Sequence, residues 1–499
     1  MQTLYHDTVI VGSGFAGRTV ASHLEPGSFM IIERGEDRDF SEVLRRYEAR
    51  AGELEAMEAQ AHAYASELPW NTFTRLSRWN YSRYAMVRGG SSNWWGGKST
   101  RFSRAVFAAG DSLAWPFAYE EMAGWYARAE RRLNLAGDPA NLDAPPVAAM
   151  PGADYWRGAF ASYFRGGMLY NTALNKDPGS TTTQGLCSGR ANCAVCREDA
   201  KARPDNIFPE HPMLFGMLAT EIEFEGERAS AVLCYDGRQL LRVAFRRLVL
   251  ACNGIETPRL LARSSLPPGV RLEHIGAYLQ DHAHLELSCK IATPLAFGSA
   301  GGLVHVAVDD ISGMYATAAG DIEVSALALT HEPRPATIKA GMDLALLQRR
   351  GSEAFLRDLN GCFDLFCELE IPPQAGLRVD LESEQPAVLD EAYESLIPAY
   401  DEVVRQMVRK LAVAGVTVTA VNPIYRSGYG GHHFCGTTNC SAGPESVVDT
   451  DMRLIGTGNV FVAGAGVIPR AGGVAPTLTL VALAERLGSH LAAADSEQA

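Results

Sequence analysis

Residues 7–17, DTVIVGSGFAG, decide the fold of this chain. The first six carry a run of β-branched side chains, typical of a short buried strand. Gly12, Gly14 and Gly17 follow with GxGxxG spacing, and RTVASHL (18–24) has helical periodicity. In such a unit the glycines permit a tight turn, close approach of a pyrophosphate and close packing of the helix on the strand. The stretch therefore predicts a strand–turn–helix unit that binds a dinucleotide.

The residues around this turn complete the predicted nucleotide site. Phe15 and Ala16 lie in this turn, before a helix whose free N–H groups and positive dipole end favour phosphates. A second strand, FMIIE (29–33), ends at Glu33, where a carboxylate can accept hydrogen bonds from ribose hydroxyls, and Arg34 follows it. This motif by itself does not distinguish FAD from NAD.

Length and composition set the broad class of protein. A chain of 499 residues predicts roughly two to four folding units. It is 47% hydrophobic and 21% charged, as in ordinary soluble globular proteins, and its net charge of −13 argues against a nucleic-acid partner. No apolar run of ~18 residues predicts a membrane span, and the start of the chain has no secretory pattern. Its ten irregularly spaced cysteines are therefore expected to be reduced, in the cytoplasm.

Four later segments resemble, in order, the glucose–methanol–choline (GMC) oxidoreductase family, which binds FAD. They are RGGSSNWWGGKSTRF (88–102), RRLVLACNGIETPRLLARS (246–264), IGAYLQDHAHL (275–285) and the block from HHFCGTTNC to LGSHL (432–491). The resemblance is nearest to FAD-dependent sugar dehydrogenases and pyranose oxidase-like members.

The resemblance implies an α/β fold with a discontinuous, Rossmann-like FAD-binding domain and an inserted α+β substrate domain on an antiparallel sheet. The expected division gives residues 1–135, 205–285 and 430–499 to the FAD-binding domain. Residues 286–429 form the substrate domain, and residues 136–204 a cysteine-containing connecting segment. ELEIPPQAGLRVDLE (368–382) predicts a strand, a turn and a strand in the antiparallel sheet, and residues 391–415 a helix that stops at Gly415. Residues 40–65 predict a further helical excursion.

The same segments imply which residues surround the cofactor. Besides the residues already named, those expected to contact FAD are Gly89, Gly90, Ser91, Asn93, Trp94, Trp95, Gly96, Gly254, Gly464, Ala475, Pro476 and Thr477. Some sugar oxidases of the family attach FAD through a His that here is replaced by Trp94. Because Trp cannot form that bond, we expect the FAD to be noncovalent.

Alcohol oxidation by a flavin needs a base for the hydroxyl proton. His433, followed by Gly436 and Thr437, aligns with the family's catalytic His, and a neutral imidazole suits this role near pH 7. The family's second catalytic position, an Asn or His before Pro, is Ala475 here. The resemblance therefore implies that another residue supplies this hydrogen bond, that His433 acts alone, or that the chemistry differs.

Cys187, Cys193 and Cys196 form a Cys-x5-Cys-x2-Cys segment. It resembles the segment of FAD-dependent glucose dehydrogenase subunits in which three cysteines hold a three-iron cluster, but it is one residue shorter before the last cysteine. Three thiolates are also one short of a closed zinc site. The shorter spacing favours a structural loop or free thiols over an iron–sulfur cluster.

The resemblance implies FAD-dependent oxidation of a CH–OH group of a sugar, glycoside or related polyol, with a small-molecule alcohol as the only implied partner. Because Ala475 departs from the family pattern, an aminoglycoside-like substrate of specialised metabolism is a further expectation. The alternative function is non-oxidative chemistry on the same scaffold, of lyase or decarboxylase type. No motif specifies the electron acceptor.

Overall fold

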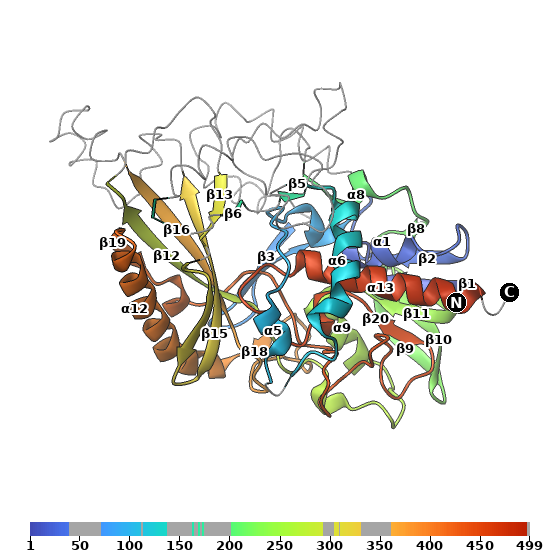
Figure 1. Cartoon of the computed structure of the whole chain (residues 1–499). Coiled ribbons are helices and arrows are strands. Elements are labelled where there is room, and N and C mark those ends of the chain that lie inside the picture. The colour runs from blue at the N-terminus through green and yellow to red at the C-terminus, as the bar shows by residue number, and fades with distance from the viewer. Residues whose placement is uncertain are drawn as a thin grey trace, which may run out of the picture.

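The computed structural model describes residues 1–38, 71–110, 113–136, 162–163, 168–169, 172–173, 201–292, 304–308, 310–330 and 361–496. Within these ranges the chain builds two large sheets that lie beside each other (Figure 1). The predicted helix at 40–65 and the three cysteines Cys187, Cys193 and Cys196 lie outside the described residues. None of the described helices is both long and apolar enough to cross a bilayer.

The first sheet has seven strands in the order β8-β2-β1-β11-β10-β9, with β20 also paired to β11. Its parallel strands are β1 (Gln2–Val11), β2 (Phe29–Ile32), β8 (Met213–Leu214), β11 (Leu240–Leu250) and β20 (Val460–Val462). Two antiparallel strands extend it, β9 (Leu218–Glu225) and β10 (Arg228–Tyr235). The strand predicted at residues 7–12 contains the buried end of β1, Thr8–Val11, which pairs with β2 on one edge and with β11 on the other.

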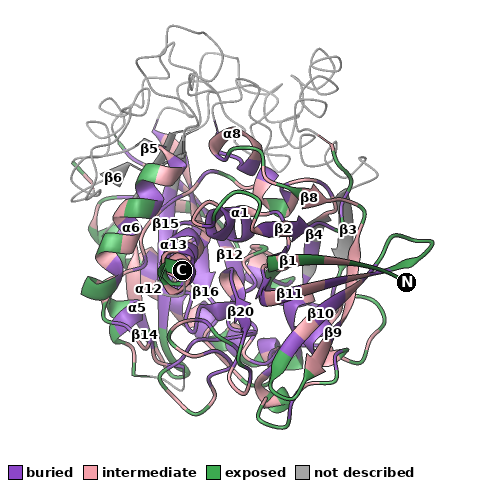
Figure 2. Cartoon of the chain, turned by 90° about the vertical axis from the view of Figure 1, so that its right-hand side faces the viewer, coloured by how far each residue is buried: buried purple, intermediate pink, exposed green. Residues whose placement is uncertain are grey.

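Helices pack on this sheet around the start of the chain. α1 (Phe15–Ala21) is buried throughout (Figure 2), and α9 (Asn253–Ala262) confirms the strand–Gly–helix segment predicted at 246–264. α13 (Thr477–Ser496) packs against both α1 and α6 (Tyr119–Leu133). Because residues 481–485 are all buried, this part of α13 is covered on every side, as expected for a core helix.

The second sheet is antiparallel and has the order β19-β12-β16-β15-β13-β6, with β14 beside β15. Its strands are β6 (Met168–Leu169), β12 (His282–Lys290), β13 (Val304–Ala307), β14 (Gly313–Thr317), β15 (Gly320–Thr330), β16 (Cys362–Glu370) and β19 (Thr417–Asn422). One face carries buried apolar residues, including Leu285, Leu287 and Leu365, in the same core cluster as α12 (Ile397–Val413). Since side chains alternate along a strand, the other face carries the polar residues of β12 and β16.

One part of the strand–turn–strand prediction for residues 368–382 is wrong. Its first strand is the end of β16, but β17 (Arg378–Val379) pairs with β18 (Val388–Leu389) in a separate small sheet. Pro372 and Pro373 intervene and have no N–H to donate to a ladder. The chain turns away and bonds instead to residues 276–279, with the Val379 N–H 2.8 Å from the Gly276 carbonyl.

Apart from the predicted helix at 391–415, the elements not yet named are short. That helix is confirmed as η5 (Glu391–Leu396) followed directly by α12, with Gly415 just beyond its end in the left-handed region. The others are β3 (Asn71–Arg75), β4 (Tyr81–Ala85), η1 (Gly90–Asn93), α5 (Arg104–Ala108), β5 (Leu135–Ala136), β7 (Thr172–Ala173), α8 (Pro204–Ile207), η4 (Leu272–His274), η6 (Ile424–Arg426) and η7 (Ala465–Val467).

Candidate active site

The turn between β1 and α1 is built so that only glycine fits at two of its positions. Gly12 has φ +109°, and a Cβ there would lie 2.4 Å from the Ala251 carbonyl oxygen. A Cβ on Gly17 would lie 2.1 Å from the Gly12 carbonyl oxygen. The helix therefore packs directly on the turn, and its first N–H groups lie at the carboxyl end of β1, where dinucleotides bind in such sheets.

Glu33 lies at the end of β2, beside this turn. Its Oε2 accepts hydrogen bonds from the Ser13 N–H at 3.0 Å and the Ser13 hydroxyl at 2.5 Å, and its Oε1 accepts from the Gly35 N–H at 2.7 Å. Burial raises the pKa of Glu33, although these three hydrogen bonds oppose the rise. Arg34 is half-exposed, with Nη1 3.7 Å from Oε1 of Glu256.

The loop at 88–96 folds over the same turn. The Gly89 N–H donates to the Ser13 hydroxyl at 2.9 Å, and the Phe15 N–H donates to the Ser92 hydroxyl at 3.1 Å. The Trp95 ring meets the Phe15 ring edge to face, with centroids 5.2 Å apart. In the same loop Asn93 and Trp94 are buried, Gly90 is partly buried, and Ser91 and Gly96 are exposed.

The remaining cofactor candidates come from the second half of the chain. A Cβ on Gly254 would lie 2.1 Å from the Phe434 carbonyl oxygen, and one on Gly464 would lie 3.8 Å from the Ala16 Cβ. Ala475 and Pro476 are buried and lead into α13 at Thr477. Because α13 packs against α1, these residues share the end of the first sheet with the β1–α1 turn. Gly12, Gly17 and Gly254 thus let neighbouring backbone segments pack closely around this turn, as in a dinucleotide-binding unit.

His433 lies opposite His282, the first residue of β12. An antiparallel bridge joins Gln280 to Cys435, with each N–H 3.0 Å from the other residue's carbonyl oxygen. Continuing this register by two residues places His282 opposite His433, and their Nδ1 atoms are 2.7 Å apart. The two rings meet nearly at right angles. His432 is exposed and has φ +62°, and its Nδ1 lies 3.4 Å from the Ser82 hydroxyl, so the two adjacent histidines have different surroundings.

Asp281 holds the backbone around this pair of histidines. Its Oδ1 accepts from the N–H groups of His282 at 2.8 Å and His433 at 3.0 Å, and its Oδ2 accepts from the His432 N–H at 3.3 Å. Burial raises the pKa of the Asp281 carboxyl, an effect that His282 and the N–H groups oppose. One carboxylate thus fixes two segments that lie 152 residues apart in sequence.

Glu368 and Lys98 complete the polar face beside the histidines. Glu368 on β16 pairs in register with His284, and its Oε1 lies 3.4 Å from Lys98 Nζ. Burial alone would raise the pKa of Glu368, but Lys98 and, at acid pH, the neighbouring histidines outweigh it and lower the pKa to about 2. Glu368 is therefore ionised at neutral pH. Its Oε2 is buried and has no hydrogen-bond partner among the described residues.

The two histidines beside Glu368 are poor proton acceptors in the ground state. Burial lowers the pKa of His433 well below its usual range, and neighbouring His282 adds to this effect. Burial also lowers the pKa of His284 to about 4. At pH 7 both rings are therefore neutral, the form that a general base requires.

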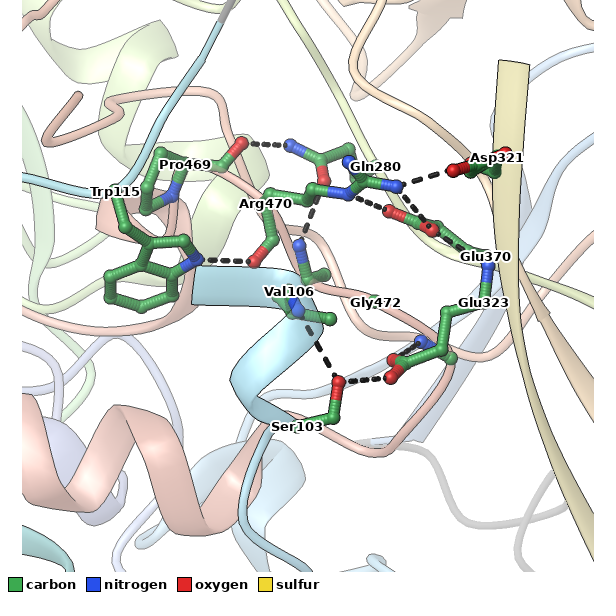
Figure 3. Close-up of polar contacts among 12 residues, drawn as sticks. Ser103, Val106, Trp115, Gln280, Asp321, Glu323, Glu370, Pro469, Arg470 and Gly472 are labelled. Carbon is green, nitrogen blue, oxygen red and sulfur yellow. Dashed lines mark hydrogen bonds and ion pairs between the residues drawn. The ribbon is translucent and has the colours of Figure 1, made fainter. Parts of the chain in front are cut away.

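A buried ionic network joins the polar face of the second sheet to the loop before α13 (Figure 3). Arg470 donates from Nε to Glu370 Oε1 at 2.6 Å and from Nη2 to Oε2 at 3.0 Å. Glu323 on β15 accepts from the Ser103 hydroxyl at 2.5 Å and from the Gly473 N–H at 2.8 Å. The loop at 469–473 is thus tied to two strands of the antiparallel sheet.

Several residues of this site were not singled out from the sequence. Asp281 and His282 stood inside a segment already matched to the family, and their adjacent titratable side chains were the available signal. Ser92 lay within the small-residue signature between two residues that were chosen. Lys98 and Glu368 stood in two separate segments that were quoted for other reasons, and only the packing of these segments brings the two side chains together.

Comparisons with known proteins agree with this arrangement. The family described as GMC oxidoreductase matches residues 7–284 with its N-terminal profile and residues 387–484 with its C-terminal profile. The fructose dehydrogenase large subunit of Gluconobacter japonicus is 24% identical, with 97% of each chain covered. Paromamine 6'-oxidase of Streptomyces fradiae is 26% identical, with 97% of this chain and 91% of that protein covered. The structure of pyridoxine 4-oxidase from Mesorbium loti has the same fold, with a TM-score of 0.63 at 17% identity, and covers 97% of this chain and 99% of its own.

Proposed function

This chain belongs to the GMC oxidoreductase family of FAD-binding enzymes, and from that premise we propose that it oxidises a CH–OH group of an amino sugar or related glycoside. The observation that carries the proposal is the neutral His433, held beside His282 and the ionised Glu368. When bound, FAD supplies the hydride acceptor for the alcohol carbon.

In the proposed reaction His433 takes the proton from the substrate hydroxyl. A neutral imidazole beside the polar sheet face is available for this step at pH 7. Positioning the hydroxyl against this base costs little reorganisation, because Asp281 and His282 already hold the His433 backbone and ring. Ala475 contributes no side-chain hydrogen bond, so His433 is the only side chain that we assign to proton abstraction.

Glu368 favours an amino sugar over a neutral sugar as the substrate. Its carboxylate is ionised and buried, and Lys98 neutralises it only through Oε1 at 3.4 Å. A substrate ammonium that reached this carboxylate would form a charge-assisted hydrogen bond, which is stronger than a bond from a neutral hydroxyl. Paromamine, named in the relative from Streptomyces fradiae, has this chemistry.

We also propose the earlier division of the chain into an FAD-binding domain (1–135, 205–285 and 430–499) and a substrate domain (286–429), joined by residues 136–204. The described parts of the two large sheets support it. A cytoplasmic location is a further proposal, supported by the buried free thiols of Cys234, Cys289, Cys367, Cys435 and Cys440.

Anaerobic mixing of the purified holoenzyme with three compounds tests the function. Paromamine, methyl α-D-glucopyranoside and D-fructose differ in charge and ring type, and we expect paromamine to bleach the oxidised flavin absorption at the lowest concentration. The matched variant Glu368→Gln keeps the shape but removes the charge, so it should raise the half-saturating concentration of paromamine by about tenfold and leave that of methyl α-D-glucopyranoside nearly unchanged. If a product forms while the flavin stays oxidised with all three, the chemistry is not oxidative and the proposal is wrong.

We propose further that the FAD is held without a covalent bond. Trp94 occupies the position where the linking His of some relatives would stand, and it is buried. Acid precipitation should therefore release all of the yellow colour into the supernatant. A yellow pellet after washing in denaturant would contradict this prediction.

A further inference from the structure

We propose that His282 is a positioning residue that fixes which nitrogen of His433 carries the proton. This inference rests on the role of His433 in the proposed function, but the hydrogen-bond geometry that supports it does not depend on activity. The chain of contacts runs from the Gly472 carbonyl through the His282 ring to the His433 ring. With His282 neutral, each link has only one possible hydrogen-bond direction.

The Gly472 carbonyl sets the direction of the first link. Its oxygen lies 2.9 Å from His282 Nε2, and a carbonyl oxygen can only accept a hydrogen bond. His282 Nε2 therefore carries a hydrogen. In a neutral imidazole the other nitrogen then has a lone pair, so His282 Nδ1 is an acceptor.

The second link follows from the first. His433 Nδ1 lies 2.7 Å from the His282 Nδ1 lone pair, so His433 Nδ1 must be the nitrogen that donates. The His433 Nε2 atom is left with its lone pair available. A general base needs that lone pair, and the opposite tautomer would present an N–H to the substrate hydroxyl instead.

The structure fixes the Gly472 carbonyl firmly enough to act as this reference point. Gly472 has φ +64°, and a Cβ there would lie 2.3 Å from Glu323 Oε2, so no other residue fits without displacement. On one side the Gly473 N–H is bonded to Glu323, and on the other the Ala471 N–H donates to Gln280 Oε1 at 3.0 Å. Gln280 Nε2 in turn donates to the Pro469 carbonyl at 2.7 Å (Figure 3).

This arrangement is also relevant to Ala475, which stands where the family has an Asn or His. His282 faces Nδ1 of His433, not the substrate, so it does not replace the hydrogen bond that Ala475 lacks. It fixes instead which nitrogen of His433 carries the proton. When Nε2 takes the substrate proton, the imidazolium keeps its Nδ1–H on a ready acceptor, as the buried carboxylate does for the His of a Ser-His-Asp triad.

A bound metal is the competing explanation for the close approach of these rings. Ligand-type atoms of Asp281, His282 and His433 lie within 4.8 Å of one another. The Asp281 oxygens, however, already accept backbone N–H groups, and a hydrogen between two nitrogens accounts for 2.7 Å directly. Element analysis of the holoenzyme should therefore find no metal in stoichiometric amount at this group.

The direct test is the nitrogen spectrum of the ring atoms in holoenzyme labelled with ¹⁵N-histidine. At pH 7.5 we expect His433 to be protonated at Nδ1 and His282 at Nε2, with assignments from single His→Asn variants. His282→Asn places its Oδ1 where His282 Nδ1 stood, so it should keep the His433 proton on Nδ1. His282→Gln reaches instead to the position of Nε2, and His282→Ala has no acceptor, so both should shift the His433 proton toward Nε2.

Kinetics give a second, separate measurement. With paromamine as substrate, His282→Ala and His282→Gln should lower the rate constant of flavin reduction by about 10–100-fold at unchanged half-saturation, and His282→Asn should recover most of the loss. His490→Asn, on the exposed side of α13, is the matched control for labelling and stability.

The outcomes separate the two proposals. An Nε2–H on His433 in the wild type, a doubly protonated His282, or a stoichiometric metal that is lost in His282→Ala would overturn the positioning role, whatever the activity. The expected spectrum together with no flavin reduction by any sugar would overturn the proposed function and leave the His282 contact intact.

Discussion

Replacement of His433 by alanine is expected to slow anaerobic flavin reduction by about 10²–10⁴-fold, the usual contribution of a positioned general base. The loss should fall on the rate constant more than on half-saturation, because the base contacts the hydroxyl proton only as it is removed. Stopped-flow absorbance with paromamine measures both quantities. His432→Asn is the matched control, because His432 is exposed, and asparagine tolerates its positive φ.

The pH dependence of flavin reduction is a second test of His433 as the base. Burial lowers the pKa of His433, and the groups that face it are His282, His432, Glu368 and Lys98. The base is therefore unprotonated from the ordinary histidine range upward, and the wild-type rate should stay level there. It should fall only at lower pH, as His433 gains a proton. His433→Ala should lack this acid limb, and a variant that keeps both the limb and the rate would remove His433 from the mechanism.

The nucleotide-binding half of the fold could be predicted from the sequence because its signals are local. The strand, the glycines and the helix at residues 7–21 follow one another directly, and their spacing alone defines the turn. The error at residues 378–379 has a different origin. Those residues have strand character, but they pair with residues 388–389 and bond to the distant residues 276–279, and their own sequence does not indicate either partner.

The same difference between local signals and long-range contacts applies to the candidate site. His433 was identified because it stands in a motif that one segment carries whole. His282 lies opposite His433 because of the bridge between Gln280 and Cys435. No local sequence pattern predicts that bridge. Glu368 and Lys98 lie 270 residues apart in sequence, and the low pKa of Glu368 depends on their contact.

Replacement of Arg470 by methionine is expected to lower the free energy of unfolding of the holoenzyme by about 3–5 kcal/mol, the usual effect of breaking a buried ion pair. The side chains of Arg470 and Glu370 are 3% and 0% exposed, and two hydrogen bonds join them. Without Arg470, the Glu370 carboxylate would stay buried with the Glu323 N–H, at 2.9 Å, as its remaining hydrogen-bond donor among the described contacts. Urea unfolding followed by tryptophan fluorescence measures the change.

Two further variants show whether the charge or the packing is responsible. Arg470→Met combined with Glu370→Met removes both charges and should recover most of the lost stability, because an uncompensated charge costs more than a missing pair. Arg426→Met breaks the exposed pair with Asp401 and should leave the unfolding midpoint unchanged. If the double variant is no more stable than the single one, the Arg470 side chain stabilises the loop by packing. In that case the loop that presents the Gly472 carbonyl to His282 does not depend on the ion pair.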